Sequence, residues 1–355
     1  MRVLLTGHRG YIGAVMTPFF QAAGHTVTGL DSGLFDSCTF GPQPPQVPAV
    51  DKDLRDIEES DLAGYDAVVH LAALSNDPLG NINPKCTFDI NHRASVRLAC
   101  LAKSAGVPRF IFSSSCSLYG TAGDEPITEE GAFNPVTAYG ESKVRVERDL
   151  VELADDAFSP TYMRNATAYG VSPSLRLDVV VNNLVAYAHA TGQVLIQSDG
   201  TPWRPLVHVE DICQAFLLVL ESPRERIHNE AFNVGASSEN YRIRDVAEMV
   251  RQAVPQSVVT YAEGGGPDLR CYRVDCEKFA RAFPQFRPRW TVARGIEEVY
   301  AAYREQKLTA DDLSGTRYFR INRIQQLQRE GQLDRFLRFR ARGPVPFAAQ
   351  SRAAS

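Results

Sequence analysis

The fold is decided near the N-terminus by the stretch Arg2-Val3-Leu4-Leu5-Thr6-Gly7-His8-Arg9-Gly10-Tyr11-Ile12-Gly13. An apolar run leads into glycines spaced G-x-x-G-x-x-G, and this pattern predicts a tight turn between a buried strand and a helix. Such a turn lets backbone N–H groups at a helix N-terminus approach a pyrophosphate. The spacing is one residue longer than the common G-x-G-x-x-G fingerprint, so the turn alone is not specific.

An acidic residue closes the next apolar stretch. Residues 26–30 read Thr-Val-Thr-Gly-Leu, and Asp31 follows them directly. A carboxylate at this place is expected to accept hydrogen bonds from the adenosine ribose hydroxyls and to repel a 2′-phosphate. No arginine follows immediately, so the pattern favours NAD over NADP as the cofactor.

The composition is that of an ordinary water-soluble protein. The 355 residues carry a formal net charge of −4, which does not suggest a nucleic-acid partner. No apolar run approaches the roughly 20 residues of a membrane helix, and no secretion signal precedes the first strand, so no membrane partner and a cytoplasmic location are expected. The 7 cysteines form no C-x-x-C pair. We therefore expect free thiols and no metal site.

Strand-like and helix-like segments alternate through the first half of the chain. This alternation predicts an α/β fold, with a Rossmann-like doubly wound parallel sheet and a smaller C-terminal substrate-binding region. Ligands of such sheets bind at the carboxyl ends of the strands. The predicted strands are Val3–Thr6, Thr26–Leu30, Ala67–Leu71, Phe110–Ser113 and Thr161–Arg164, and later helices are predicted at Asp178–Ala190, Val209–Leu220, Ile243–Ala253 and Val292–Glu305.

Three regions are expected along the chain. Residues 1–168 form an NAD-binding domain, rejoined by segments near 205–235, and residues 169–307 form the substrate-binding region. Residues 308–355 form an arginine-rich helical extension that ends in a flexible tail from 343. The arginines indicate either an arm for a polyanion or a partner, or a peripheral helix with a solvated basic face. We favour the peripheral helix.

The segment Tyr139-Gly140-Glu141-Ser142-Lys143 places a phenol and an ammonium group four residues apart, on one face of a helix. An unperturbed tyrosine, with a pKa of about 10, is a poor base at neutral pH. The cations of Lys143 and a nicotinamide ring would favour its ionisation. The tyrosinate then takes a proton from a sugar hydroxyl while hydride leaves the same carbon.

A hydroxyl-rich strand end precedes this helix in the chain. Residues 110–120 read Phe-Ile-Phe-Ser-Ser-Ser-Cys-Ser-Leu-Tyr-Gly. A buried strand that ends in serines places hydrogen-bond donors at the carboxyl edge of the sheet. Ser115 is the candidate donor to the reacting oxygen.

The order of these motifs resembles the extended short-chain dehydrogenase/reductase family of nucleotide-sugar epimerases and dehydratases. The resemblance covers residues 1–305. It rests on residues 6–13 (TGHRGYIG), Asp31, residues 70–73 (HLAA), residues 113–120, residues 139–143 (YGESK) and residues 204–211 (RPLVHVED).

The resemblance implies a role for each matching residue. Ser115, Tyr139 and Lys143 would be catalytic. The cofactor NAD would be bound by Gly7, Gly10, Tyr11, Ile12, Gly13, Asp31, Asp53, Leu54, Leu71, Ala72, Ala73, Asn91, Ser113, Tyr139 and Lys143. A nucleotide-diphosphate sugar would be bound by Ser75, Ser117, Asn182, Asn183, Arg204 and Arg270. Arginine suits this last task because its fork binds phosphate oxygens in pairs.

One departure from the family narrows the chemistry. Dehydratases that resemble this chain carry an acidic pair directly after the serine, whereas Cys116 and Ser117 stand here. Elimination of water needs such an acid, so we expect an NAD-dependent epimerase that acts at C4 through a transient 4-keto sugar. The alternatives are an NAD(P)H-dependent keto-sugar nucleotide reductase and a non-catalytic NAD-binding regulatory or scaffold protein. The resemblance also implies a homodimer, paired through helices near 87–105 and 139–154.

Overall fold

The computed structural model describes residues 1–340 except 45, 76, 122, 124, 265, 267 and 269, and leaves the side chains of 77, 78 and 82 undescribed. The flexible tail predicted from residue 343 lies outside the described residues. Among the described residues, no helix is long and apolar enough to cross a membrane.

A seven-stranded sheet forms the centre of the molecule, and all of its neighbouring strands are parallel. In spatial order the strands are β10 (Glu230–Val234), β6 (Ser159–Asn165), β5 (Arg109–Ser115), β4 (Ala67–His70), β1 (Arg2–Thr6), β2 (Thr26–Asp31) and β3 (Ala49–Asp51). The strand order reverses direction at β1, as in a doubly wound Rossmann sheet. The predicted fold class is confirmed.

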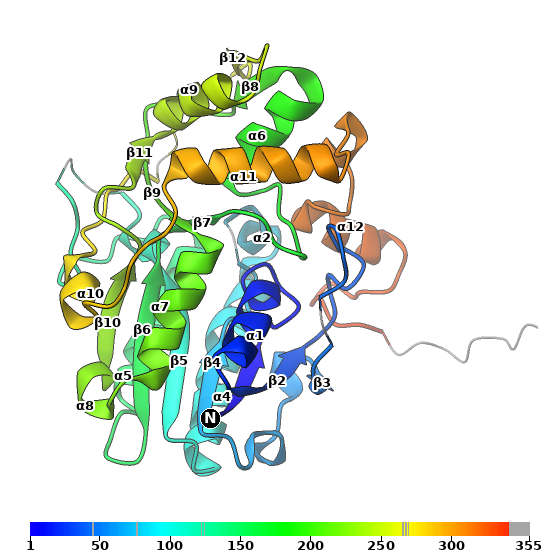
Figure 1. Cartoon of the computed structure of the whole chain (residues 1–355). Helices are drawn as coiled ribbons and strands as arrows, with labels where there is room; N and C mark the ends of the chain where they lie inside the picture. The colour runs from blue at the N-terminus through cyan, green and yellow to red at the C-terminus, as the bar shows by residue number, and fades with distance from the viewer. Residues whose placement is uncertain are drawn as a thin grey trace, which may run out of the picture.

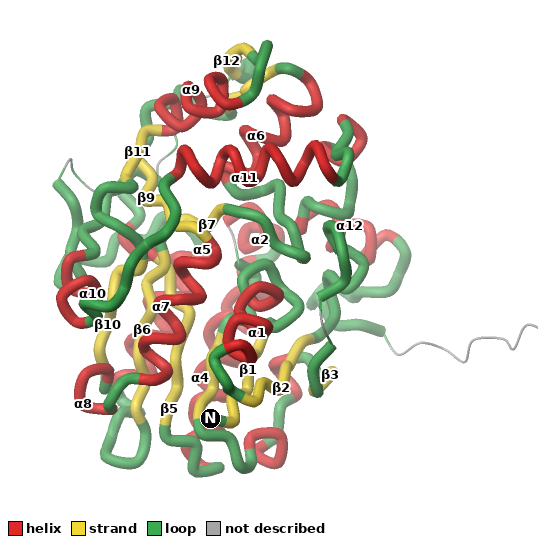
Figure 2. The backbone as a smooth tube through the Cα atoms, in the orientation of Figure 1, coloured by secondary structure: helices red, strands yellow, loops and turns green. Residues whose placement is uncertain are grey.

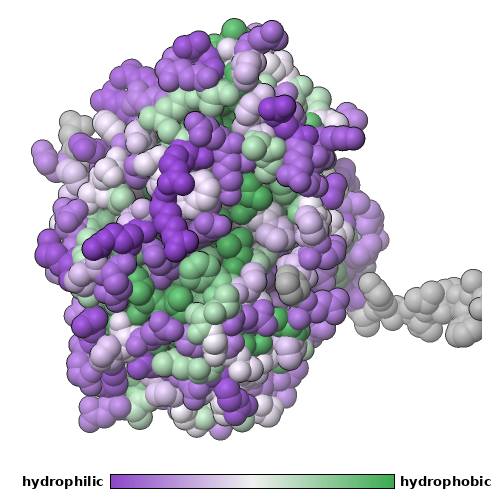
Figure 3. Space-filling view, in the orientation of Figure 1, coloured by the Kyte–Doolittle hydropathy of each residue, from purple (hydrophilic) through white to green (hydrophobic). Residues whose placement is uncertain are grey.

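Helices cover both faces of this sheet (Figures 1 and 2). α1 (Gly13–Ala22) and α7 (Val209–Glu221) pack on one face, and α4 (Ala94–Ser104) and α5 (Ala138–Val151) pack on the other. Successive side chains of β1 point to opposite faces of the sheet. Val3 and Leu5 are buried under α1 and α7, and Leu4 is buried under α4 and α5. In Figure 3, apolar side chains show between hydrophilic ones over α1 and α7.

The remaining elements lie mostly beyond the carboxyl ends of the strands or at the edges of the sheet. Two small sheets contain β7 (Thr167–Tyr169), β9 (Trp203–His208) and β11 (Asn240–Arg242), and β8 (Gln193–Ile196) with β12 (Val258–Tyr261). The other helices are α2 (Asp77–Ile82), α3 (Pro84–Thr87), α6 (Val180–Thr191), α8 (Arg224–Ile227), α9 (Ile243–Ala253), α10 (Glu277–Ala282) and α11 (Val292–Glu305). Shorter turns of helix are η1 (Leu54–Asp56), η2 (Glu59–Leu62), η3 (Phe88–Arg93), η4 (Cys116–Tyr119) and η5 (Ala310–Leu313).

The chain continues past α11 and returns to the sheet. We call residues 319–340 the C-terminal strap; it begins with α12 (Arg320–Arg329). Its apolar side chains Ile324, Leu327, Leu333 and Leu337 are buried against residues of the first half of the chain. The expectation of a solvated basic face is wrong for Arg320, which is 3% exposed. Burial of these apolar side chains against Leu74, Leu79 and Cys86 holds the strap on the molecule.

Candidate functional site

A cavity of about 800 Å³ lies at the carboxyl ends of the central strands. Its walls come from the ends of β1, β2, β4 and β5, from α5, and from the segment that contains α6 and β9. Every residue that the sequence predicts for the site lines this cavity except Asn91 and Asn182. Residues far apart in the chain therefore meet in one place.

The glycine-rich turn closes one end of the cavity. Gly7 has φ +74°, a conformation that favours glycine, and a Cβ there would come within 2.8 Å of the backbone nitrogen of Ala72. A Cβ on Gly13 would lie 2.2 Å from the carbonyl oxygen of Gly7. This close packing brings the backbone N–H groups at the start of α1 to the cavity, as a dinucleotide pyrophosphate requires. The residues present therefore fit NAD.

Asp31 lies beside this turn, at the end of β2. One of its carboxylate oxygens accepts a hydrogen bond from the backbone nitrogen of Arg9 at 3.2 Å, and the other from that of Gly33 at 3.0 Å. The Arg9 side chain lines the same part of the cavity and pairs with Asp36 at 3.2 Å and Asp51 at 2.6 Å. This part of the cavity thus carries a fixed carboxylate and a guanidinium that two other carboxylates already hold.

Helix α5 places Tyr139 and Lys143. The Thr137 hydroxyl caps its N-terminus by accepting a hydrogen bond from the backbone nitrogen of Gly140 at 3.1 Å. A Cβ on Gly140 would lie 2.9 Å from the carbonyl oxygen of Ser117, so the first turn of α5 packs directly against η4. This approach brings Tyr139 to the serines at the end of β5.

Lys143 is buried between α5 and β5. Its Nζ donates to the carbonyl oxygen of Ser113 at 2.7 Å and lies 5.6 Å from the centre of the Tyr139 ring. Burial lowers the pKa of Lys143 to about 7, against the opposing effect of the Glu147 carboxylate. Lys143 therefore changes its charge near neutral pH.

The side chains at the end of β5 point in two directions. The Ser117 hydroxyl donates to Ser115 Oγ at 2.9 Å, and both side chains line the cavity. Cys116 is fully buried on the opposite side, in an apolar cluster, and its Sγ lies 3.1 Å from the carbonyl oxygen of Arg164. Burial raises the pKa of the Cys116 thiol. Cys116 thus packs in the core and offers no proton to the cavity.

A buried ion pair supports the floor of the site. Arg164 Nη2 lies 2.7 Å from a carboxylate oxygen of Glu147, and both side chains are almost fully buried. Glu147 also accepts a hydrogen bond of 2.5 Å from the Ser114 hydroxyl. The pair ties α5 to β5 and β6, and so fixes the helix that carries Tyr139. No motif in the sequence indicates this role.

Two arginines and a carboxylate gather at the other end of the cavity. Arg204, on β9, and Arg270 both bind Asp268, at 2.7 and 2.6 Å. Arg204 also donates to the carbonyl oxygen of Arg270. Asn183 lines the same region, where α6 begins with no side-chain cap. The backbone N–H groups of α6 and the two guanidinium groups could bind a diphosphate there.

Two predicted residues lie outside the cavity. Asn91 is buried, and its side chain exchanges hydrogen bonds with the backbone of Leu74. Asn182 is fully buried and accepts from the backbone nitrogen of Gly170 while donating to the hydroxyl of Tyr11. Their amides position neighbouring parts of the wall instead of facing a ligand.

Several lining residues were not predicted from the sequence, and three of them are polar side chains deep in the chain's fold. Asn165 follows a predicted strand directly, and its Oδ1 has no hydrogen-bond partner among the described residues. Arg176 binds Asp178, two residues later, and donates to the Ser75 hydroxyl at 3.0 Å. The sequence could have indicated two of them, because Asn165 follows a predicted strand directly and Arg176 stands two residues before Asp178. Arg320 had no local signal, because only the fold of the C-terminal strap brings it to the cavity.

Comparison with known proteins agrees with this geometry. The model of the NAD dependent epimerase/dehydratase family matches residues 3–235. A curated UDP-glucose 4-epimerase from Corynebacterium glutamicum is 29% identical over 267 residues, which cover 71% of this chain and 80% of the relative.

Solved structures agree as well. MoeE5 in complex with UDP-glucuronic acid and NAD matches with a TM-score of 0.75 and 26% identity, over 86% of this chain and 99% of that chain. TunA, described as an NAD dependent NDP-hexosamine 5,6-dehydratase, has a TM-score of 0.75 at 24% identity, over 86% of this chain and 98% of that one. The likeness to TunA shows the fold alone.

Proposed function

Because the chain belongs to the NAD-dependent epimerase/dehydratase family, we propose that it epimerises a nucleotide-diphosphate sugar, at C4 of the hexose. NAD, the cofactor of this family, supplies a hydride acceptor that returns the hydride to the same carbon. The sugar would pass through a 4-keto form, turn in the cavity and be reduced on its other face. No net oxidation results, and no second substrate is needed.

Three side chains would handle the proton. Tyr139 takes it from the C4 hydroxyl as the hydride leaves, and returns it when the ketone is reduced. Ser115 donates a hydrogen bond to the reacting oxygen and orients it. The Lys143 ammonium group, when protonated, stabilises the tyrosinate, since its Nζ lies 5.6 Å from the ring centre.

The burial of Cys116 is the observation that carries the choice of epimerisation. Elimination of water requires an acid beside the leaving hydroxyl, and the residue after Ser115 turns into the core. The carboxylates that line the described part of the cavity are engaged elsewhere. They are Asp31, bound by backbone N–H groups, and Asp53, Asp178 and Asp268, each paired with arginine.

The nucleotide diphosphate would bind between Arg204, Arg270 and the start of α6. Asp268 forms ion pairs with both guanidinium groups, so a diphosphate would compete with this carboxylate or bind beside it. Asn183, Ser75 and Tyr139 line the same cavity. This placement leaves the sugar beside the serines and the tyrosine.

A panel of nucleotide sugars tests the proposal. The purified protein is mixed with each sugar without added cofactor, and the products are identified by NMR. An epimer supports the proposal. A 4-keto-6-deoxy product would mean that another group serves as the acid, and turnover of a keto-sugar only with added NADH would mean a reductase.

We also propose a homodimer formed through the outer faces of α4 and α5. The exposed residues there include Arg97, Arg145, Arg148 and the apolar Val151, which is 44% exposed, while Val144 is buried in the chain's own core. Light scattering across micromolar concentrations tests the dimer, and the mass of a single chain throughout would reject it.

A further inference from the structure

Arg320 is a buried cation in the wall of the cavity. It is 3% exposed, and its guanidinium carbon lies 4.2 Å from the centre of the Phe35 ring. Nη2 donates to the carbonyl oxygen of Ser174 at 3.0 Å and to its hydroxyl at 2.5 Å. Nη1 is buried and has no hydrogen-bond partner among the described residues.

The described neighbours of Arg320 do not neutralise its charge. The ionisable groups with the strongest electrostatic effect on Arg320 are the Cys38 thiol and the cation of Arg176. Asp178 also acts on Arg320, but two hydrogen bonds from Arg176 already hold its carboxylate. Burial lowers the pKa of Arg320 to about 10. A guanidinium buried without an ionic partner is costly, so an anion that binds beside Arg320 would be strongly favoured.

A short chain of hydrogen bonds connects Arg320 to the glycine-rich turn. Ser174, which Arg320 contacts, donates its backbone N–H to the Ser172 hydroxyl at 3.1 Å. That hydroxyl donates to the carbonyl oxygen of Tyr11 at 2.7 Å. Arg320 is thus linked through two serines to the turn that leads into α1, where a pyrophosphate would bind.

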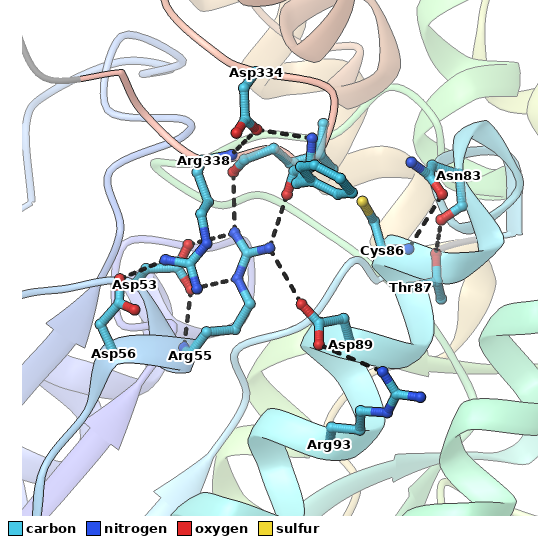
Figure 4. A network of polar contacts seen from close by, with 12 residues as sticks. Asp53, Arg55, Asp56, Asn83, Cys86, Thr87, Asp89, Arg93, Asp334 and Arg338 are labelled. Carbon is cyan, nitrogen blue, oxygen red and sulfur yellow. Dashed lines mark hydrogen bonds and ion pairs between the residues drawn. The ribbon is translucent and has the colours of Figure 1, made fainter.

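The C-terminal strap is anchored beside the same cofactor site (Figure 4). The buried guanidinium of Arg55 binds Asp53 and donates to the carbonyl oxygens of Phe336 and Leu337, at 2.8 and 3.3 Å. The Leu337 side chain lines the cavity.

Two further contacts hold the strap at its rim. Arg338 lies 2.6 Å from Asp56, and the Asn83 side chain donates to the carbonyl oxygen of Arg335 at 3.1 Å. With its apolar residues buried as well, the strap holds Arg320 in a defined place.

We propose that Arg320 binds the pyrophosphate of NAD, and that the C-terminal strap is therefore a part of the cofactor site. A pyrophosphate provides the anion that the described neighbours of Arg320 do not, and guanidinium binds phosphate oxygens through paired hydrogen bonds. Arg320 lies beyond residue 235, where the match to the family model ends. The proposal holds whichever sugar the protein acts on.

Replacement of Arg320 by Met and by Lys tests the proposal, with Arg329→Met as the control on an exposed position of the same helix. The dissociation rate of bound NADH is followed by fluorescence after a chase with excess NAD. A charged hydrogen bond contributes about 1.5–3 kcal/mol, so Arg320→Met should speed release by about 10- to 100-fold. Arg320→Lys should give a smaller effect, and Arg329→Met a change within about twofold.

Titration with UDP shows which diphosphate Arg320 binds. We expect the affinity of Arg320→Met for UDP to stay within about twofold of the wild type. NADH release at the wild-type rate in a folded Arg320→Met variant would overturn the proposal. A loss of UDP affinity without faster NADH release would also overturn it, because the anion would then belong to the nucleotide sugar. If the Met variant does not fold, Arg320→Lys decides by the same two measurements.

Discussion

The Nζ of Lys143 lies 5.6 Å from the centre of the Tyr139 ring, one helical turn away on α5. The same Nζ is fixed by the carbonyl oxygen of Ser113 at 2.7 Å. A titratable ammonium group is thus held next to the phenol, at a place from which water is mostly excluded. The first two predictions follow from these two side chains.

Tyr139→Phe should abolish most of the turnover and leave NAD bound. The phenol hydroxyl is the proposed proton acceptor and donor, and general acid–base catalysis contributes about 10²–10⁴-fold. Turnover is compared by NMR, and the NAD content by absorbance of the denatured protein. Tyr65→Phe, before β4, is the matched control. A Tyr139→Phe variant with turnover within twofold of the wild type would contradict the role of Tyr139.

Lys143→Met should stabilise the nucleotide-free protein, most strongly at low pH. The pKa of Lys143 is about 7 when folded and has its usual value near 10.5 when unfolded. Between these values the unfolded chain binds more protons, so the stability of the wild type rises with pH relative to the variant. We expect the variant to melt about 3 °C higher at pH 6.5.

This advantage should shrink as the pH rises toward 10. Differential scanning calorimetry measures it, with the exposed Lys85→Met as the control. A lower melting temperature for Lys143→Met at pH 6.5, or an advantage that grows with pH, would show that burial of the ammonium group is not costly.

Asp31→Ala should reduce the preference for NAD over NADP. Removal of the carboxylate eliminates a like-charge contact with the 2′-phosphate, which we expect to be worth about tenfold in relative affinity. Arg9, whose backbone nitrogen binds Asp31, would then supply a cation to that phosphate. Calorimetric titration with both cofactors measures the change.

The double variant Arg9→Ala/Asp31→Ala separates these two effects. It should lose the affinity for NADP that Asp31→Ala gains. Equal affinity of the wild type for both cofactors would place Asp31 away from the ribose.

The sequence predicts the sheet well because its strands are apolar runs between turns. The predicted bounds of α9 and α11 are also those of the structure. The strand that contains Phe110 extends further than predicted, to Ser115, because the backbone of Ser114 and Ser115 continues the pairing with β6 although their side chains are polar. Periodicity detects apolar burial and does not detect such strand ends.

The site was predictable where a local motif carries it and not where only tertiary packing does. Tyr139 and Lys143 share one helix, so their spacing was sufficient. Asn182 stands next to Asn183, yet it faces the core and holds Tyr11, because neighbouring residues on a helix point about 100° apart. The position of Arg320 depends on how the strap folds back over the first half of the chain, and no motif near Arg320 in the sequence indicates that position.

The most direct test of the account is epimerisation by the purified protein with no added cofactor, in deuterated water. We predict that it converts a saturated nucleotide sugar to its C4 epimer, reaches the same mixture from either side, and incorporates no deuterium at carbon. Tyr139 exchanges its proton only with oxygen, and the hydride returns to the carbon that it left. A 4-keto-6-deoxy product, or no conversion until a stoichiometric amount of NADH is added with a keto-sugar, would contradict the account.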